Sequence, residues 1–227
     1  HPHRGFETVT YILAGKMRHK DSTGREGVIE PGGIQRMTAA RGIIHSEMPE
    51  QTDGLLQGFQ LWVNLPSDLK MAPAQYREFP ADAVPVEQRD DGSIIRVVAG
   101  LTDEGTQGPV TEVATDPLYL DVELAEGAQF SQAIPNTHNA FVYVIAGEIS
   151  VVDETASSSA GERSLAVLDC GDRVTIVGES NSARLLLVAG KRLNEPVARY
   201  GPFVMNTREE IIQAANDYQN GNFLTDS

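Results

Sequence analysis

The chain has 227 residues, of which 41 % are hydrophobic, enough to bury the core of one large domain or two small ones. Its 18 basic and 32 acidic residues give a formal net charge of −14, which argues against direct binding to nucleic acids or to anionic membranes. No run reaches the roughly 18 apolar residues of a membrane span, and the single cysteine, Cys170, cannot form an internal disulfide, so we expect a cytoplasmic protein.

Short segments in which apolar and polar residues alternate follow one another along the chain, each closed by Gly, Pro, Asn or Asp. The clearest are 7–21, 58–65, 93–100, 118–124 and 141–154. This pattern predicts β-strands, and strands at such spacing favour barrels or sandwiches of antiparallel sheet. The fold class is therefore expected to be all-β.

An internal repeat divides the chain. The segment YILAG at 11–15 returns as YVIAG at 143–147, an offset of 132 residues, and the sequence around Gly32 resembles that around Gly171 at an offset of 139. Two related β-barrels are therefore expected. We place the first in residues 1–66, a linker rich in Pro and Asp in 67–92, and the second in 93–227.

Near the C-terminus the pattern changes to a helical period. Thr207 and Glu210 have the spacing of a capping box, and Gly221 supplies a stop. The apolar face would consist of Ile211, Ala214, Ala215 and Tyr218. We expect one amphipathic helix, assigned with the second barrel, that packs onto a barrel.

Two pairs of residues suggest a metal site. On a strand, residues i and i+2 point the same way with Cα atoms about 6 to 7 Å apart, so His1 and His3 can share one metal ion, and His45 and Glu47 repeat this geometry. If their strands are neighbours, three imidazoles and one carboxylate converge. Such a donor set suits Fe(II), with Mn, Ni, Cu or Zn as alternatives, and an octahedral ion would keep two open positions.

The sequence pattern alone does not decide which glutamate supplies the carboxylate of this set. Glu7 shares a strand face with His1 and His3, and competes with Glu47 as a ligand. If Glu7 is not a ligand, we expect it to hydrogen-bond a ligand histidine and fix its tautomer. His19 lies in a polar segment and is expected to be solvated, whereas His138 is expected to be a loop histidine without a partner.

The second repeat carries no comparable set. Under the two offsets, the positions of His1, His3, His45 and Glu47 are occupied by Ala133, Pro135, Arg184 and Leu186. The second barrel is therefore expected to keep the scaffold without the metal ligands.

Three stretches resemble signatures of the pirin family of the cupin superfamily, and the resemblance runs almost end to end. They are HPHRGFETVTYILAG, DSTGREGVIEPGGIQRMTAARGIIHSEMP and YGPFVMNTREEIIQAANDYQNGNF. The resemblance implies two tandem cupin (jelly-roll) barrels with a C-terminal helix. It also implies iron in the N-terminal barrel on His1, His3, His45 and Glu47, which favours Glu47 over Glu7.

The chain departs from the generic cupin pattern in one way and from the pirin pattern in another. A generic cupin places its third histidine soon after the P-x-G turn, where this chain has Arg36, and the histidine follows nine residues later, as in pirins. Pirins also carry several dozen residues before the first motif, so we expect upstream strands of the first barrel to be missing.

The resemblance implies two functions of different classes. Some pirins resemble quercetin 2,3-dioxygenases, which open a flavonol with O₂, and Glu47 would then be both metal ligand and general base. Phe6, Met17, Phe59 and Trp62 are candidate pocket walls. Other pirins are iron-dependent, redox-sensing regulators that bind a transcription factor or a metabolic enzyme. The fold does not decide between them. We expect a monomer in either case.

Overall fold

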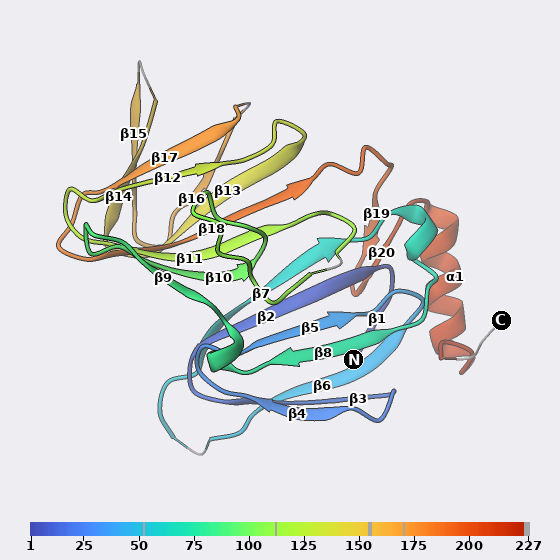
Figure 1. Ribbon diagram of the computed structural model, residues 1–227. Coiled ribbons are helices and arrows are strands. Elements are labelled where there is room, and N and C mark those ends of the chain that lie inside the picture. The colour runs from blue at the N-terminus through green and yellow to red at the C-terminus, as the bar shows by residue number, and fades with distance from the viewer. Residues whose placement is uncertain (52, 112, 154–155, 170, 225–227) are drawn as a thin grey trace. The chain divides into compact units, whose positions relative to one another are not determined.

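The computed structural model describes residues 1–51, 53–111, 113–153, 156–169 and 171–224 (Figure 1). The chain forms two compact units, His1–Ala83 with Leu193–Ser227, and Val84–Arg192. Strands dominate both units, and the described part of the chain contains a single α-helix. The all-β prediction with one C-terminal helix is therefore confirmed. No helix among the described residues has both the length and the apolar character needed to cross a membrane.

The first unit contains two four-stranded antiparallel sheets (Figure 1). One has the order β1 (Pro2–His3), β6 (Ile43–Pro49), β3 (Met17–Asp21) and β4 (Glu26–Ile29). The other has the order β7 (Gln57–Asn64), β2 (Phe6–Ala14), β5 (Ile34–Thr38) and β8 (Gln75–Phe79). All of β2 from Phe6 to Ile12 is buried, because this strand lies between two neighbours within its sheet and carries bulky side chains.

The second unit repeats this plan, with six strands in the sheet that corresponds to the sheet of β7, β2, β5 and β8. Its strands are, in order, β16 (Leu165–Val167), β13 (His138–Ala146), β18 (Ala183–Lys191), β11 (Leu118–Leu124), β10 (Ile94–Ala99) and β9 (Val86–Gln88). The other sheet has the order β12 (Gln129–Ala133), β17 (Arg173–Gly178), β14 (Glu148–Val152) and β15 (Ser157–Gly161). A large aliphatic cluster, which includes Val122, Val142 and Leu187, fills the unit.

The repeat seen in the sequence marks the same turn in both units. Gly15 follows β2 and Gly147 follows β13, and both have a φ of 76°. A left-handed backbone of this kind favours glycine, because a side chain there would be strained. The predicted equivalence of 11–15 and 143–147 therefore reflects equivalent strands and turns.

The C-terminal segment forms the hairpin β19 (Ala198–Tyr200) and β20 (Phe203–Met205), followed by α1 (Arg208–Gln219). The capping box is present: the Glu210 backbone N–H donates to Thr207 Oγ1 at 3.2 Å, and the Thr207 backbone N–H donates to Glu210 Oε2 at 2.9 Å. Ile211 and Ala214 of the predicted apolar face are buried, whereas Tyr218 is 44 % exposed.

This segment belongs to the first unit, although the sequence assigned it to the second barrel. Arg4 forms an ion pair with Asp217 at 2.6 Å, and the Val204 N–H donates to the Arg4 carbonyl at 3.0 Å. A Cβ placed on Gly5 would lie 1.9 Å from the Val204 carbonyl oxygen, so only glycine permits this approach. The amphipathic pattern predicts a helix but does not say which barrel its apolar face covers.

The boundary between the barrels also differs from the expected linker. Residues up to Ala83 pack with the first unit, and β8 pairs along β5 with Phe79 opposite Ile34. Two short 3₁₀ helices, η1 (Ser67–Leu69) and η2 (Ala81–Ala83), flank this strand. Strand β8 lies at the edge of its sheet, where polar residues are common, and its sequence QYREF is largely polar. Because of this composition, the sequence analysis placed it in the linker.

Candidate metal centre

The strands that carry the predicted ligands are neighbours. In the antiparallel pair β1 and β6, His3 lies opposite Ile43, and the backbone N–H of His45 donates to the His1 carbonyl at 2.9 Å. His1 and His45 are thereby placed side by side, with their Nε2 atoms 2.8 Å apart. The expected adjacency of the two pairs is present in the structure.

Three imidazoles converge at this point. The ring centroids are 4.6 Å apart for His1 and His3, 4.3 Å for His1 and His45, and 4.9 Å for His3 and His45. One nitrogen from each ring lies within 4.8 Å of one from each of the others. Donor atoms at this separation could be bound by one metal ion.

The environment keeps two of these rings neutral. Burial lowers the pKa of His3 to about 4, against a weaker opposing effect of the Pro202 carbonyl. Burial, with the nearby His3 and His19, lowers the pKa of His45 to about 3. Neutral imidazoles expose the lone pairs that a metal requires. The buried Nδ1 of His45 has no hydrogen-bond partner among the described residues, which fits a site built for an ion.

Glu47 lies on β6, the strand that also carries His45, and extends the site. Its two carboxylate oxygens accept hydrogen bonds from Gln60 Nε2 at 2.8 and 3.0 Å. Burial raises the pKa of Glu47, and the Gln60 hydrogen bond acts in the opposite direction. A Glu47 oxygen lies within 4.8 Å of donor nitrogens of His19 and His45. The described donors thus form two groups that share His45, with His1 and His3 in one and His19 and Glu47 in the other.

Glu7, the competing carboxylate, lies in neither group. Its Oε2 accepts hydrogen bonds from Arg36 Nε at 2.6 Å and from Thr38 Oγ1 at 2.7 Å. Arg36 occupies the position where a generic cupin would carry its third histidine, and its charge here compensates that of Glu7. The expected hydrogen bond from Glu7 to a ligand histidine is replaced by this buried ion pair.

Two histidines are placed otherwise than predicted. His19 is on β3 with a fully buried side chain, and its Nε2 lies 2.8 Å from Asp21 Oδ2. His138 begins β13, is 8 % exposed, and its Nε2 lies 3.0 Å from the Asp116 carbonyl oxygen. The sequence did not predict that these two histidines are buried. A histidine that hydrogen-bonds inside the protein has the same hydropathy as one that faces water.

Aromatic rings flank one side of the group. The Phe6 ring lies 5.1 Å from the His3 ring and 4.3 Å from the Trp62 ring, and Trp62 lies 5.4 Å from His3. Phe6 is buried, whereas Trp62 is 37 % exposed. Met17 and Phe59, the other predicted pocket walls, are half-buried and remain predictions.

Comparison with known proteins identifies the family of the chain. The family model for pirin matches residues 1–63, and that for the pirin C-terminal cupin domain matches residues 119–224. A pirin-like protein of Caulobacter vibrioides is 51 % identical over 223 residues, which cover 98 % of this chain and 79 % of that protein. The chain belongs to the pirin family.

Two further relatives of this pirin carry the name of an activity. A Pseudomonas aeruginosa protein, provisionally named a quercetin 2,3-dioxygenase, is 48 % identical over 97 % of this chain and 78 % of its own length. A crystal structure of quercetin 2,3-dioxygenase from Acinetobacter baumannii superposes with a TM-score of 0.91 at 36 % identity, covering 99 % of this pirin and 79 % of that chain. The expected family, and with it the two cupin domains, is confirmed.

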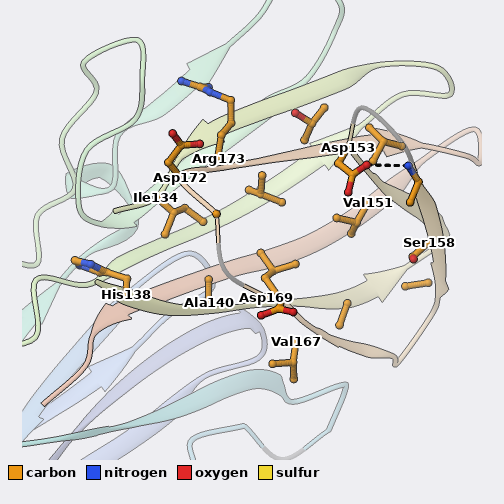
Figure 2. Close-up of a pocket in the computed structure, with 18 of the residues that line it drawn as sticks. Ile134, His138, Ala140, Val151, Asp153, Ser158, Val167, Asp169, Asp172 and Arg173 are labelled. Carbon is orange, nitrogen blue, oxygen red and sulfur yellow. Dashed lines mark hydrogen bonds between the residues drawn. The ribbon is translucent and has the colours of Figure 1, made fainter. Parts of the chain in front are cut away.

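The second cupin domain of this pirin contains an open pocket of about 430 Å³ (Figure 2). Its lining includes Ile134, His138, Ala140, Val151 and Arg173. Arg173 is held by an ion pair with Asp103 at 2.6 Å. Both candidate metal-donor groups among the described residues lie in the first domain.

Proposed function

We propose that this pirin binds iron and acts on flavonols as an oxygenase of the quercetin 2,3-dioxygenase type. The ligands we assign are His1, His3, His45 and Glu47. The observation that carries the proposal is the convergence of three imidazoles, of which His3 and His45 are buried and neutral, with a half-buried carboxylate joined to them through the shared His45. The names of the relatives from Pseudomonas and Acinetobacter support the substrate class.

The donor set suits Fe(II), with Mn, Ni, Cu or Zn as alternatives. Bound iron would supply a Lewis acid for the flavonol hydroxyl and would orient the flavonol and O₂. Three nitrogens and one oxygen from the protein leave two positions of an octahedral ion for these two reactants.

Glu47 is the residue that we propose handles the proton. Its carboxylate would accept the proton of the flavonol hydroxyl, because burial raises its pKa and makes it a stronger base than an exposed glutamate. Gln60 holds both carboxylate oxygens and so fixes the orientation in which the proton is received. A positioned general base contributes a factor of about 10² to 10⁴ to the rate.

Phe6 and Trp62 are suited to a planar aromatic substrate. Their rings lie at an interplanar angle of 32°, and both make T-shaped contacts with the His3 ring. Because Trp62 is partly exposed, it would form the side of the site through which the substrate enters. An aromatic face next to polar donors is the usual composition of a small-molecule site.

The experiment is metal analysis of the purified protein followed by oxygen uptake with quercetin. Iron-loaded wild type should consume O₂ faster than free Fe(II), and His45→Ala should abolish this uptake. His138→Ala is a matched control, since His138 is also buried but lies outside both donor groups. If fully loaded wild type consumes no more O₂ than free Fe(II), the protein is not an oxygenase for this substrate.

The second candidate is a non-catalytic, iron-dependent regulator that binds a transcription factor or a metabolic enzyme. The formal charge of −14 favours a partner with a basic surface, and oxidation of the iron would change the charge of the site by one unit. This candidate takes precedence if the protein retains iron but shows no turnover with quercetin.

A further inference from the structure

We propose that the pocket of the second cupin domain binds a compact apolar compound that carries an ammonium or hydroxyl group and no negative charge (Figure 2). The pocket measures about 430 Å³, which is within the range of small-molecule sites in proteins. The described residues that line it include none of the metal-donor groups. The proposal therefore goes beyond the oxygenase activity and does not depend on the metal centre.

The pocket occupies the place in the second barrel that the histidine cluster occupies in the first. In the register of β1 with β6 and of β12 with β17, Val174 corresponds to His45 and Ile134 to His3. Both aliphatic side chains line the pocket. The position that holds imidazoles in one barrel therefore encloses an apolar space in the other.

Alanines at three strand positions leave this space open. Ala140 of β13, Ala160 of β15 and Ala166 of β16 all line the pocket. The inward positions of a small barrel are usually filled by side chains, which leave no room for a ligand. The space thus follows from the sequence, since a longer aliphatic side chain at these positions would project into it.

The walls are apolar and belong to the core of the unit. Ile134, Ala140 and Val174 are buried members of the aliphatic cluster, and Val151 and Leu168 pack against it. Side chains that are fixed by core packing give the pocket a defined shape before any ligand binds. An apolar ligand would remove these walls from water, which is a favourable contribution to binding.

The polar groups of the lining select the head group of the ligand. Asp153, Asp169 and Asp172 contribute carboxylates, and Ser158 and Thr175 contribute hydroxyls. An ionised carboxylate accepts hydrogen bonds and cannot donate one. A ligand with ammonium or hydroxyl donors therefore complements these groups, whereas an anionic ligand would bring a further negative charge beside them.

The guanidinium of Arg173 does not reverse this balance. Arg173 is the only lysine or arginine among the described residues of the lining. Its Nη1 pairs with Asp103 Oδ2 at 2.6 Å and donates to Ser131 Oγ at 3.2 Å. Because Asp103 does not line the pocket, this pair neutralises Arg173 without using the carboxylates of the lining. The net charge that faces a ligand is therefore negative.

The test uses the intact chain and three matched naphthalene compounds: 1-naphthylmethylammonium, 1-naphthalenemethanol and 1-naphthoate. Binding is followed by NMR. Shifts of the methyl groups of Val151, Leu168 and Val174 report the pocket. The indole N–H of Trp62, the single tryptophan of the chain, reports the first unit. We expect the ammonium compound and the alcohol to bind in the pocket about tenfold more tightly than the carboxylate.

Variants test the walls and the charge separately. Ala166→Leu should fill the pocket and weaken binding of the ammonium compound and the alcohol by about tenfold or more. Ala160→Leu, on another edge strand, is a second variant of the same kind. Ala146→Leu is the matched control, because Ala146 of β13 is exposed and does not line the pocket. Asp172→Asn should reduce the discrimination against the carboxylate by about two- to fivefold.

Shifts of the pocket methyl groups that are lost in Ala166→Leu or Ala160→Leu and kept in the control would support the site. A preference for the ammonium compound over the alcohol would then identify an amine as the ligand, and equal binding a hydroxyl compound. Equal or tighter binding of the carboxylate would overturn the proposal. Shifts confined to Trp62, no shift in the pocket near the solubility limit, or unchanged binding by both folded leucine variants would overturn it as well.

Discussion

In the first unit β6 brings His45 and Glu47 against β3, whereas in the second unit β17 brings Val174 and Ile176 against β14. The two pairs of strands have the same register, with Glu47 opposite His19 and Ile176 opposite Val151. One scaffold thus surrounds a cluster of imidazoles in one copy and an aliphatic cluster in the other. The stability of the barrel comes from packing, and the donors of the first unit are added at a cost in buried polar groups.

The register also corrects the residue-by-residue alignment of the repeats. Because β12 pairs with β17 as β1 pairs with β6, the counterparts of His1 and His3 are Gln132 and Ile134. The sequence offset had given Ala133 and Pro135, and a slip of one residue turns every side chain to the other face of a strand. The sequence also aligned β6 with β18, although β18 is the equivalent of β7 in its pairing with the long strand.

The largest effect is expected where the two units differ most. Because His45 is common to both donor groups, His45→Ala should abolish metal binding, with a loss of affinity of more than about 100-fold. Val174→Ala at the equivalent position should leave the metal bound and lower the free energy of unfolding by about 1 to 3 kcal/mol. Calorimetry and metal titration of the two variants measure both quantities. Tight metal binding by His45→Ala would show that the ion is held elsewhere.

The two candidate carboxylate ligands of the first unit, Glu47 and Glu7, should separate metal binding from stability. Glu47→Gln should weaken the metal and abolish oxygenase activity, because an amide does not neutralise a cation. Glu7→Gln should keep the metal but break the buried ion pair between Glu7 and Arg36, at a cost of about 3 kcal/mol in unfolding free energy. Urea unfolding of the metal-free proteins and metal titration of the folded ones distinguish these outcomes. Exchange of the two behaviours would make Glu7 the ligand.

Metal removal should affect only one unit. An ion present at 100 times its Kd stabilises the state that binds it by about 2.7 kcal/mol, so amide hydrogens of β3 and β6 should exchange more slowly in the loaded protein. Exchange in β14 and β17 serves as the internal control. Equal protection of both pairs of strands would indicate that the metal acts on the whole chain and not on the donor group.

The adjacency of the two candidate ligand pairs was predictable because it depends on local order. Residues i and i+2 on a strand share a face whatever the rest of the fold does, and β1 and β6 needed only to be neighbours. His19 was not predictable in this way, since Arg18, His19 and Lys20 are all polar and only the buried site separates the inward from the outward side chains. The attachment of α1 to the first unit depends on tertiary contacts such as the Arg4 and Asp217 ion pair, for which the sequence gives no local signal.

The smallest expected effect concerns a buried lysine of the first unit. Lys70 is 1 % exposed, and its ammonium donates to the Gly5 carbonyl at 2.7 Å, to Asn64 Oδ1 at 2.6 Å and to the Val204 carbonyl at 3.0 Å. Lys70 therefore links the bend before β2 and the end of β7 to strand β20 of the C-terminal hairpin. No lysine of the second unit is buried in this way among the described residues.

Burial lowers the pKa of Lys70 to about 8 from its usual 10.5. Between these two values the unfolded chain binds the proton and the folded chain does not, so stability should rise with pH across this window and be constant below it. Lys70→Met removes the titrating group, and the difference in unfolding free energy between wild type and variant should change by on the order of 1 kcal/mol from pH 8 to 10.5. Urea unfolding at several pH values measures this difference. A difference independent of pH would show that Lys70 keeps its proton throughout, held by its three oxygen acceptors.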